Sequence, residues 1–90
     1  MSKESRNDIR RVFDEVRDMV VAKNKQYGDS VLDPVRIFSK APIHEQIKVR
    51  LDDKLSRLAR GDDSMESDDD IFRHIMGYCA LAIISIERNK

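Results

Sequence analysis

Residues that bind ions or phosphate groups gather in three short patterns of this 90-residue sequence. In the first, MESDDDIFRHIMGY, Glu66 and Asp70 precede His74. Asp70 and His74 are four residues apart, so on a helix a carboxylate oxygen and an imidazole nitrogen can approach one ion or bond to each other. Carboxylates suit magnesium, whereas histidine is a poor magnesium ligand. Glu66, Asp70 and His74 are therefore candidate metal ligands.

The same acids also have a purely structural interpretation. Asp68, Asp69 and Asp70 stand where a helix is expected to begin, and negative side chains stabilise the positive end of a helix dipole. Ser67, three residues before Asp70, completes a capping box. An aspartate and a histidine one turn apart also commonly bond to each other without any metal. The sequence is compatible with two interpretations of this stretch: the start of a helix, and a site that faces a cation or phosphate.

The second pattern, RLDDKLSR, places a basic stripe on a predicted helix. Arg50, Asp53, Lys54 and Arg57 share the face opposite the leucines. Guanidinium and ammonium groups bind phosphate oxygens, and Asp53 could help to hold a bridging cation. Alternatively, Asp53 pairs with Arg50 and Arg57 at helical spacing, and the stripe is an ordinary solvated face.

The third pattern, AKNKQYG, lies at the end of the first predicted helix. A nucleotide base could stack on Tyr27 while Lys23, next to Asn24, meets a phosphate. The alternative is a helix C-terminus, where the helix dipole favours Lys23 and Lys25 and Gly28 takes the left-handed turn.

Amphipathic segments must position these patterns, and the first of them is predicted to be a long helix. Its apolar residues recur at helical spacing from Ile9 to Val20, behind a capping box formed by Ser5 and Asp8. The helix should end near Gly28.

The second long helix should run from about Ile43 to Arg60, with Gly61 as its stop. In the connection before it, Asp33 could cap a short helical turn that begins at Pro34, and Pro42 suits the first turn of the second helix.

A third helix should begin after Ser67 and reach about Glu87. One sector of it carries a polar edge made of Asp70, His74, Tyr78 and Ser85. The expected fold is all-α, with three long helices plus a short one in a single domain over residues 1–90. A chain of this size has a marginal core, so we expect the small helical bundle to be completed by oligomerisation.

Composition limits the remaining functions. The formal net charge of zero gives no global attraction to DNA, RNA or an anionic membrane. The single Cys79 lies in the apolar run from Ile75 to Ile86, which is about half a bilayer span, and is expected to be buried as a small hydrophobe. Without a membrane segment or a signal sequence, a cytoplasmic location is expected. P-loop, dinucleotide, paired-cysteine and nucleophile-elbow motifs are all absent.

In this order, KNKQYGDS, VRLDDKLSRL and ESDDDIFRHIMGY resemble small phage and bacterial proteins of the nucleotide-modification-associated type. These look distantly related to the MazG-like all-α nucleoside triphosphate pyrophosphatases. The resemblance covers roughly residues 12–86, and the residues that match its motifs are Lys23, Asn24, Tyr27, Gly28, Asp53, Lys54, Arg57, Leu58, Glu66, Asp70, Gly77 and Tyr78. His74 stands where the resembling proteins have a second aspartate. Asp14, Glu15 and Asp18 match an early acidic element only loosely and project away from the apolar stripe, with only Glu15 near its border, so they are not assigned as ligands.

The resemblance implies a nucleotide-binding all-α protein of phage type whose partner is a nucleoside triphosphate or another nucleotide. Magnesium, the implied cofactor, would lie among Asp53, Glu66, Asp70 and His74. The nucleotide would meet Lys23, Asn24, Tyr27, Arg50, Lys54, Arg57 and Tyr78. In the pyrophosphatases, paired acids hold magnesium, which positions the triphosphate for attack by water. His74 leaves open whether this chain is a magnesium-dependent pyrophosphohydrolase or an impaired one.

Two further interpretations need no catalysis. The acidic stretch GDDSMESDDD could mimic phosphate charge, which suits a phage interaction protein that sequesters a nucleotide signal or inhibits a host protein. The chain could also be a purely structural homo-oligomer.

Overall fold

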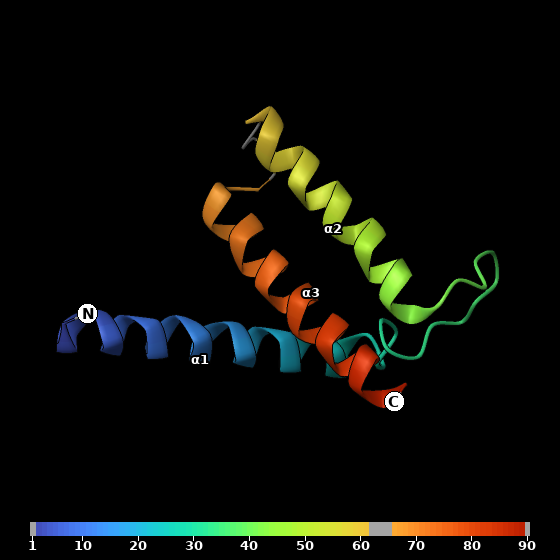
Figure 1. Ribbon diagram of the computed structural model, residues 1–90, viewed down its shortest axis with the longest axis horizontal. Helices are drawn as coiled ribbons and strands as arrows, with labels where there is room; N and C mark the ends of the chain where they lie inside the picture. Colours follow the sequence, from blue (N-terminus) through green and yellow to red (C-terminus); the bar gives the residue numbers. More distant parts are fainter. Residues whose placement is uncertain (1, 62–65, 90) are drawn as a thin grey trace.

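The computed structural model describes residues 2–61 and 66–89, in which the chain forms three helices and no strand. They are α1 (Lys3–Gln26), α2 (Ile43–Arg60) and α3 (Asp68–Arg88) (Figure 1). The predicted all-α class is confirmed. Residues 62–65 of the predicted acidic linker lie outside the described part of the chain. None of the three helices is both long enough and apolar enough to cross a membrane.

The helix ends follow local capping chemistry, with one correction. α2 has the predicted bounds, and Gly61 ends it in the left-handed conformation at φ 72°. The hydroxyl of Ser67 accepts a hydrogen bond from the Asp70 amide, so α3 begins at its predicted cap. The predicted capping box of Ser5 and Asp8 is wrong. Ser2 caps α1 instead, because its hydroxyl accepts from the Ser5 amide at 3.0 Å and the helix begins one turn earlier.

The connection from α1 to α2 forms turns and bends, so the predicted short helix after Asp33 is also wrong. Arg36 lies at φ 62°, which interrupts any helical run there. Its Nη1 donates hydrogen bonds to the carbonyl oxygens of Lys40 and Ala41 at 3.3 and 3.0 Å. Lys40 Nζ in turn donates to the Arg36 carbonyl at 2.7 Å. These bonds hold the segment as a closed loop.

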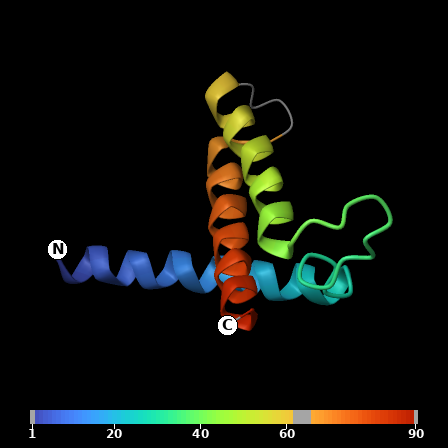
Figure 2. The ribbon, with the colours of Figure 1, turned by 45° about the vertical axis from the view of Figure 1, so that its right-hand side comes forward.

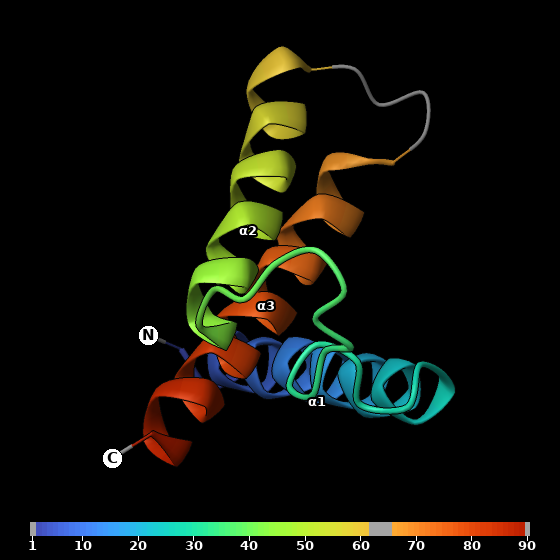
Figure 3. The ribbon, with the colours of Figure 1, turned by 90° about the vertical axis from the view of Figure 1, so that its right-hand side faces the viewer.

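α3 is the central helix, because it packs against both of the others. α2 and α3 form an antiparallel pair, and α1 crosses α3 so that the N-terminal half of α1 extends beyond the pair (Figures 1 and 2). In the described residues α1 and α2 do not pack on each other. The view in Figure 3 shows α1 running beneath the α2–α3 pair, with the connection between α1 and α2 beside it. Space is therefore left between α1 and α2.

The core is small. Its buried hydrophobic side chains are Val16, Leu32, Ile47 and Ile71, contributed by α1, the connection, α2 and α3. Large apolar side chains stay exposed on every element, among them Ile9 and Phe13 on α1, Phe38 in the connection, and Phe72, Ile83 and Ile86 on α3. Cys79 is exposed as well, contrary to the prediction. The reason is that α1 and α2 cover only part of α3, so one side of its apolar surface has no cover within the described chain.

Gly77 sets the distance between α1 and α3. A Cβ placed at this position would lie 2.8 Å from Cγ2 of Val20, a stiff side chain that cannot easily move aside. We expect Gly77→Ala to lower the free energy of unfolding by about 1 kcal/mol, because overpacking outweighs the better helix propensity of alanine.

The matched control is the same substitution in a Val20→Ala background, where the obstructing methyl group is absent. There Gly77→Ala should raise the free energy of unfolding by about 1 kcal/mol through helix propensity alone. Urea unfolding followed by circular dichroism measures both differences. The same sign in both backgrounds would contradict the close contact.

Candidate functional site

A cavity of about 350 Å³ lies between the C-terminal part of α1, the start of the connection, α2 and α3. Seven residues singled out in the sequence line it: Lys23, Asn24, Tyr27, Arg50, Lys54, His74 and Tyr78. They come from three sequence patterns that are far apart in the chain. The structure thus brings together most of the predicted nucleotide-binding residues in one place.

Helical spacing explains how each element presents its side chains. Arg50 and Lys54 are one turn apart on α2, and His74 and Tyr78 are one turn apart on α3, so each pair shares a face. Tyr27 is the C-cap residue of α1, where the chain turns into the connection. Apolar groups that the sequence did not single out complete the lining, including Met19, Val31 and Leu81. Their contribution depends on how the helices cross, so local sequence carries no signal for it.

Glu66 accepts hydrogen bonds from three basic side chains at one end of the cavity. Lys54 Nζ lies 2.8 and 3.2 Å from the two carboxylate oxygens, and Arg57 Nη1 lies 2.6 Å from Oε1. His74 Nδ1 lies 3.1 Å from Oε2. The side chains of Lys54, Glu66 and His74 are only 13%, 18% and 22% exposed. We call these four residues, Lys54, Arg57, Glu66 and His74, the Glu66 cluster.

The hydrogen bond from Lys54 lowers the pKa of Glu66, against the opposing effect of burial, and the bond from His74 acts in the same direction as Lys54. Glu66 is therefore a carboxylate at neutral pH. Its charge balances part of the positive charge that Lys54 and Arg57 bring to this end of the cavity.

His74 links the Glu66 cluster to α1. Lys23 Nζ lies 3.1 Å from His74 Nε2, and an ammonium group can only donate, so Nε2 accepts. Nδ1 then carries the proton and donates to Glu66. With these partners Nδ1 is the donor and Nε2 the acceptor of the ring.

Two tyrosine rings and an asparagine complete the polar lining. The guanidinium carbon of Arg50 lies 5.9 Å from the centroid of the Tyr78 ring, which is a cation–π distance. Tyr27 is 61% exposed. Asn24 Nδ2 donates to Asp29 Oδ1 at 2.7 Å and so also holds the turn after α1, where Gly28 takes the predicted left-handed conformation.

The candidate metal ligands are less closely gathered. Asp53 pairs with Arg57 at 3.1 Å with its side chain 58% exposed, and Asp70 is exposed at the start of α3. Only Glu66 and His74 contact each other. Within residues 2–61 and 66–89, no group of three or more His, Cys, Asp or Glu side chains is placed to hold a metal ion. Magnesium binding stays a prediction.

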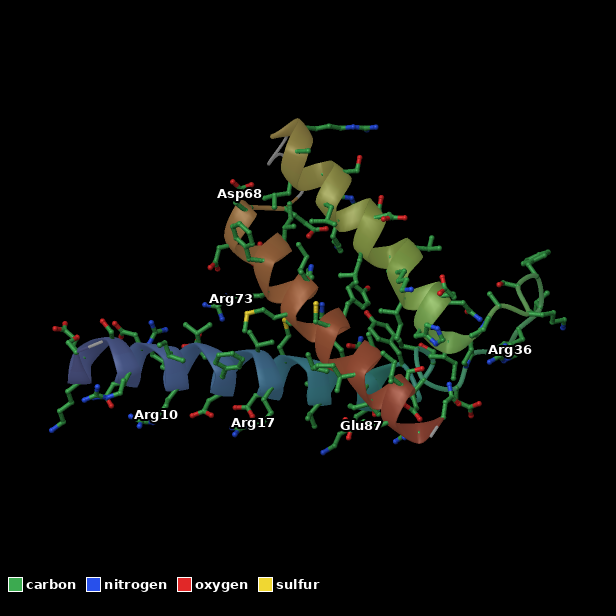
Figure 4. The ribbon with its side chains drawn as sticks, in the orientation of Figure 1. Arg10, Arg17, Arg36, Asp68, Arg73 and Glu87 are labelled. Atoms are coloured by element: carbon green, nitrogen blue, oxygen red, sulfur yellow. The ribbon has the colours of Figure 1, made fainter. Side chains whose placement is uncertain are left out.

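Arg73 is a residue that the sequence patterns did not single out. Its side chain lies on the side of α3 that faces α1 (Figure 4). Its Nη1 lies 2.9 Å from Glu15 Oε2 on α1, and its Nε lies 3.1 Å from Asp69 Oδ2. The hydrogen bond from Arg73, followed by one from Arg11, lowers the pKa of Glu15. The only sequence signal was the place of Glu15 near the border of the apolar stripe. Arg73 thus ties α1 to α3 outside the cavity.

Comparison of the chain with protein-family models, with curated protein sequences and with solved structures finds no match.

The Glu66 cluster predicts a specific pH dependence of stability. Because folding lowers the pKa of Glu66 below its ordinary value of 4.5, the stabilisation is present above that pH and is lost as the pH falls through the lowered pKa. We expect Glu66→Gln to lower the free energy of unfolding by about 2 kcal/mol at pH 7. The difference from wild type should shrink below about pH 4.

Urea unfolding across this pH range measures the effect. Asp69→Asn is the matched control, because it also removes one carboxylate charge but from a side chain that is 73% exposed, and it should change stability little. A Glu66→Gln effect of constant size from pH 7 to pH 3 would contradict the ionic cluster.

Proposed function

We propose that the protein binds a nucleotide in the cavity between α1, α2 and α3. The observation that carries the proposal is the composition of the lining: the basic side chains of Lys23, Arg50 and Lys54 together with the rings of Tyr27 and Tyr78. Basic side chains bind phosphate oxygens, and aromatic rings stack on bases. The volume of about 350 Å³ lies in the range of small-molecule sites.

Two independent lines support this proposal. The sequence motifs that resemble nucleotide-modification-associated and MazG-like proteins include Lys23, Asn24, Tyr27, Lys54 and Tyr78. Those residues lie around a single cavity although they come from three helices. Magnesium would reach the site on the phosphates of the nucleotide, as this ion commonly does, because Glu66 already accepts bonds from three basic side chains.

The proposal has two alternatives. In the first, the protein hydrolyses the bound nucleotide and releases pyrophosphate; in the second, it binds the nucleotide without hydrolysis and so sequesters it. Both use the same cavity. The basic and aromatic side chains of the cavity lining support the binding step, which both forms share.

The binding test is titration calorimetry with a panel of nucleoside triphosphates and cyclic nucleotides, with and without magnesium, followed by analysis of pyrophosphate release. Arg50→Ala should weaken binding by about tenfold, because it removes one charge-assisted phosphate contact. Arg60→Ala is the matched control: Arg60 is an exposed arginine in the last turn of α2, outside the cavity lining. The absence of binding to every nucleotide would contradict the proposal.

We also propose that the chain forms homo-oligomers through α3. This second proposal rests on the exposed apolar side chains of that helix, since Ile83 and Ile86 are 58% and 49% exposed next to exposed Cys79. Contiguous apolar surface of this kind usually marks an interaction site. A host protein is the alternative occupant of this surface.

Sedimentation equilibrium should therefore give a mass above that of one chain. Ile83→Glu should reduce it to the monomer mass, since a charge cannot be buried unpaired in such an interface. Phe38→Glu in the connection is the control, because Phe38 is 98% exposed and lies on a different element. A monomeric wild type, or equal effects of the two substitutions, would contradict assembly through α3.

A further inference from the structure

We infer that Lys54, Arg57 and His74 form a phosphate subsite that Glu66 occupies in this structure, and that a terminal phosphate of the ligand takes the place of the Glu66 carboxylate. The inference deepens the proposed function and rests on it. It gives Glu66 the role of an internal anion rather than that of a metal ligand.

The contacts of Glu66 are those that a bound phosphate would make. Its carboxylate oxygens receive hydrogen bonds from an ammonium group, a guanidinium group and an imidazole, at 2.8, 2.6 and 3.1 Å. Arginine and lysine recognise carboxylate and phosphate with the same donors, so a site built for one accepts the other. The partly buried position of Lys54 and His74 strengthens these bonds relative to those at an open surface.

The subsite opens into the cavity. Lys54 and His74 belong both to the Glu66 cluster and to the cavity lining. Lys23, bonded to His74 Nε2, and Arg50, one turn before Lys54, supply positive charge in the cavity itself. A phosphate held by Lys23 and Arg50 therefore lies next to the subsite, and a further phosphate of the same ligand can enter it. This places Arg57, which does not line the cavity, within the binding site.

Exchange of Glu66 for a phosphate is sterically simple. Glu66 precedes Ser67, the N-cap of α3, and so lies outside every helix. Its side chain can turn toward solvent without unwinding α3. A phosphate monoester brings a charge of about −1.5 to −2 and three acceptor oxygens, against one charge and two oxygens for the carboxylate. The incoming group therefore satisfies the same donors and neutralises more of their charge.

The change in ligand affinity caused by Glu66→Gln distinguishes two roles for Glu66. If Glu66 competes with the ligand, Glu66→Gln strengthens binding, because it removes the competing charge and keeps the size of the side chain. If Glu66 only positions Lys54 and His74, the same substitution weakens binding. Asp69→Asn, which also removes one carboxylate charge but from the pair with Arg73 outside the cavity, controls for the change in net charge.

The experiment is titration calorimetry with orthophosphate, pyrophosphate, AMP, ADP and ATP on the full chain. Glu66→Gln should bind pyrophosphate, ADP and ATP about tenfold more tightly than wild type, with AMP changed much less. Asp69→Asn should match wild type within about twofold. Arg57→Ala should weaken the binding of ADP and ATP and leave the binding of AMP unchanged. Because the Arg57 side chain is 47% exposed, we expect the variant to fold.

Weaker or unchanged ADP and ATP binding by Glu66→Gln, where wild type binds nucleotides, would overturn the subsite and leave the proposed function standing. Binding of ADP by Glu66→Gln alone would support the subsite and show that Glu66 blocks the wild-type site. No binding of any probe to either protein would overturn both proposals.

Discussion

The close contact of α1 with α3 at Gly77 determines where the cavity between the helices lies. Because Gly77 has no side chain, Val20 approaches the α3 backbone closely, and α1 crosses α3 at the level of the cavity. α2 packs along α3 but not on α1, and the cavity between them is lined by all three helices and the start of the connection. A larger residue at position 77 would move α1 away and with it Lys23, Asn24 and Tyr27. The geometry of the cavity thus depends on one glycine.

The same arrangement of the helices places several basic side chains around the cavity. α1 contributes Lys23 and α2 contributes Arg50 and Lys54, while α3 contributes a histidine and a tyrosine to the lining. Placing several cations around a partly enclosed space is unfavourable unless an anion lies among them. Glu66 supplies such an anion beside Lys54, which lines the cavity. The stability of the chain without ligand and the proposed affinity for an anionic ligand are therefore opposed through the same carboxylate.

Local capping interactions made the ends of the helices predictable from the sequence. The crossing of the helices was not predictable, because it depends on contacts between residues far apart in the chain. Gly61 and Ser67 mark helix ends through interactions that span only a few residues, so the sequence located the end of α2 and the start of α3. The edge of α3 that carries His74 and Tyr78 followed from helical spacing and does line the cavity. In contrast, the contacts of Glu66 with Arg57 and His74, and of Arg73 with Glu15, join residues on different elements and depend on the helix crossing. The sequence does not distinguish Ser2 from Ser5 as the cap of α1, because both serines give an equally good local pattern.

The exposed apolar residues of α1 and the cavity lie on different parts of this helix. Val16 is buried, whereas Ile9 and Phe13, earlier on the same stripe, are 41% and 61% exposed. Both belong to the N-terminal half of α1, which extends beyond the α2–α3 pair (Figure 2). The cavity is lined by later residues of this helix, from Met19 onward. If the proposed assembly through α3 also covers this half of α1, the cavity around Lys23 and Tyr27 stays open. Because the helix is long, burial of its exposed apolar residues and access of a ligand to its basic end do not compete.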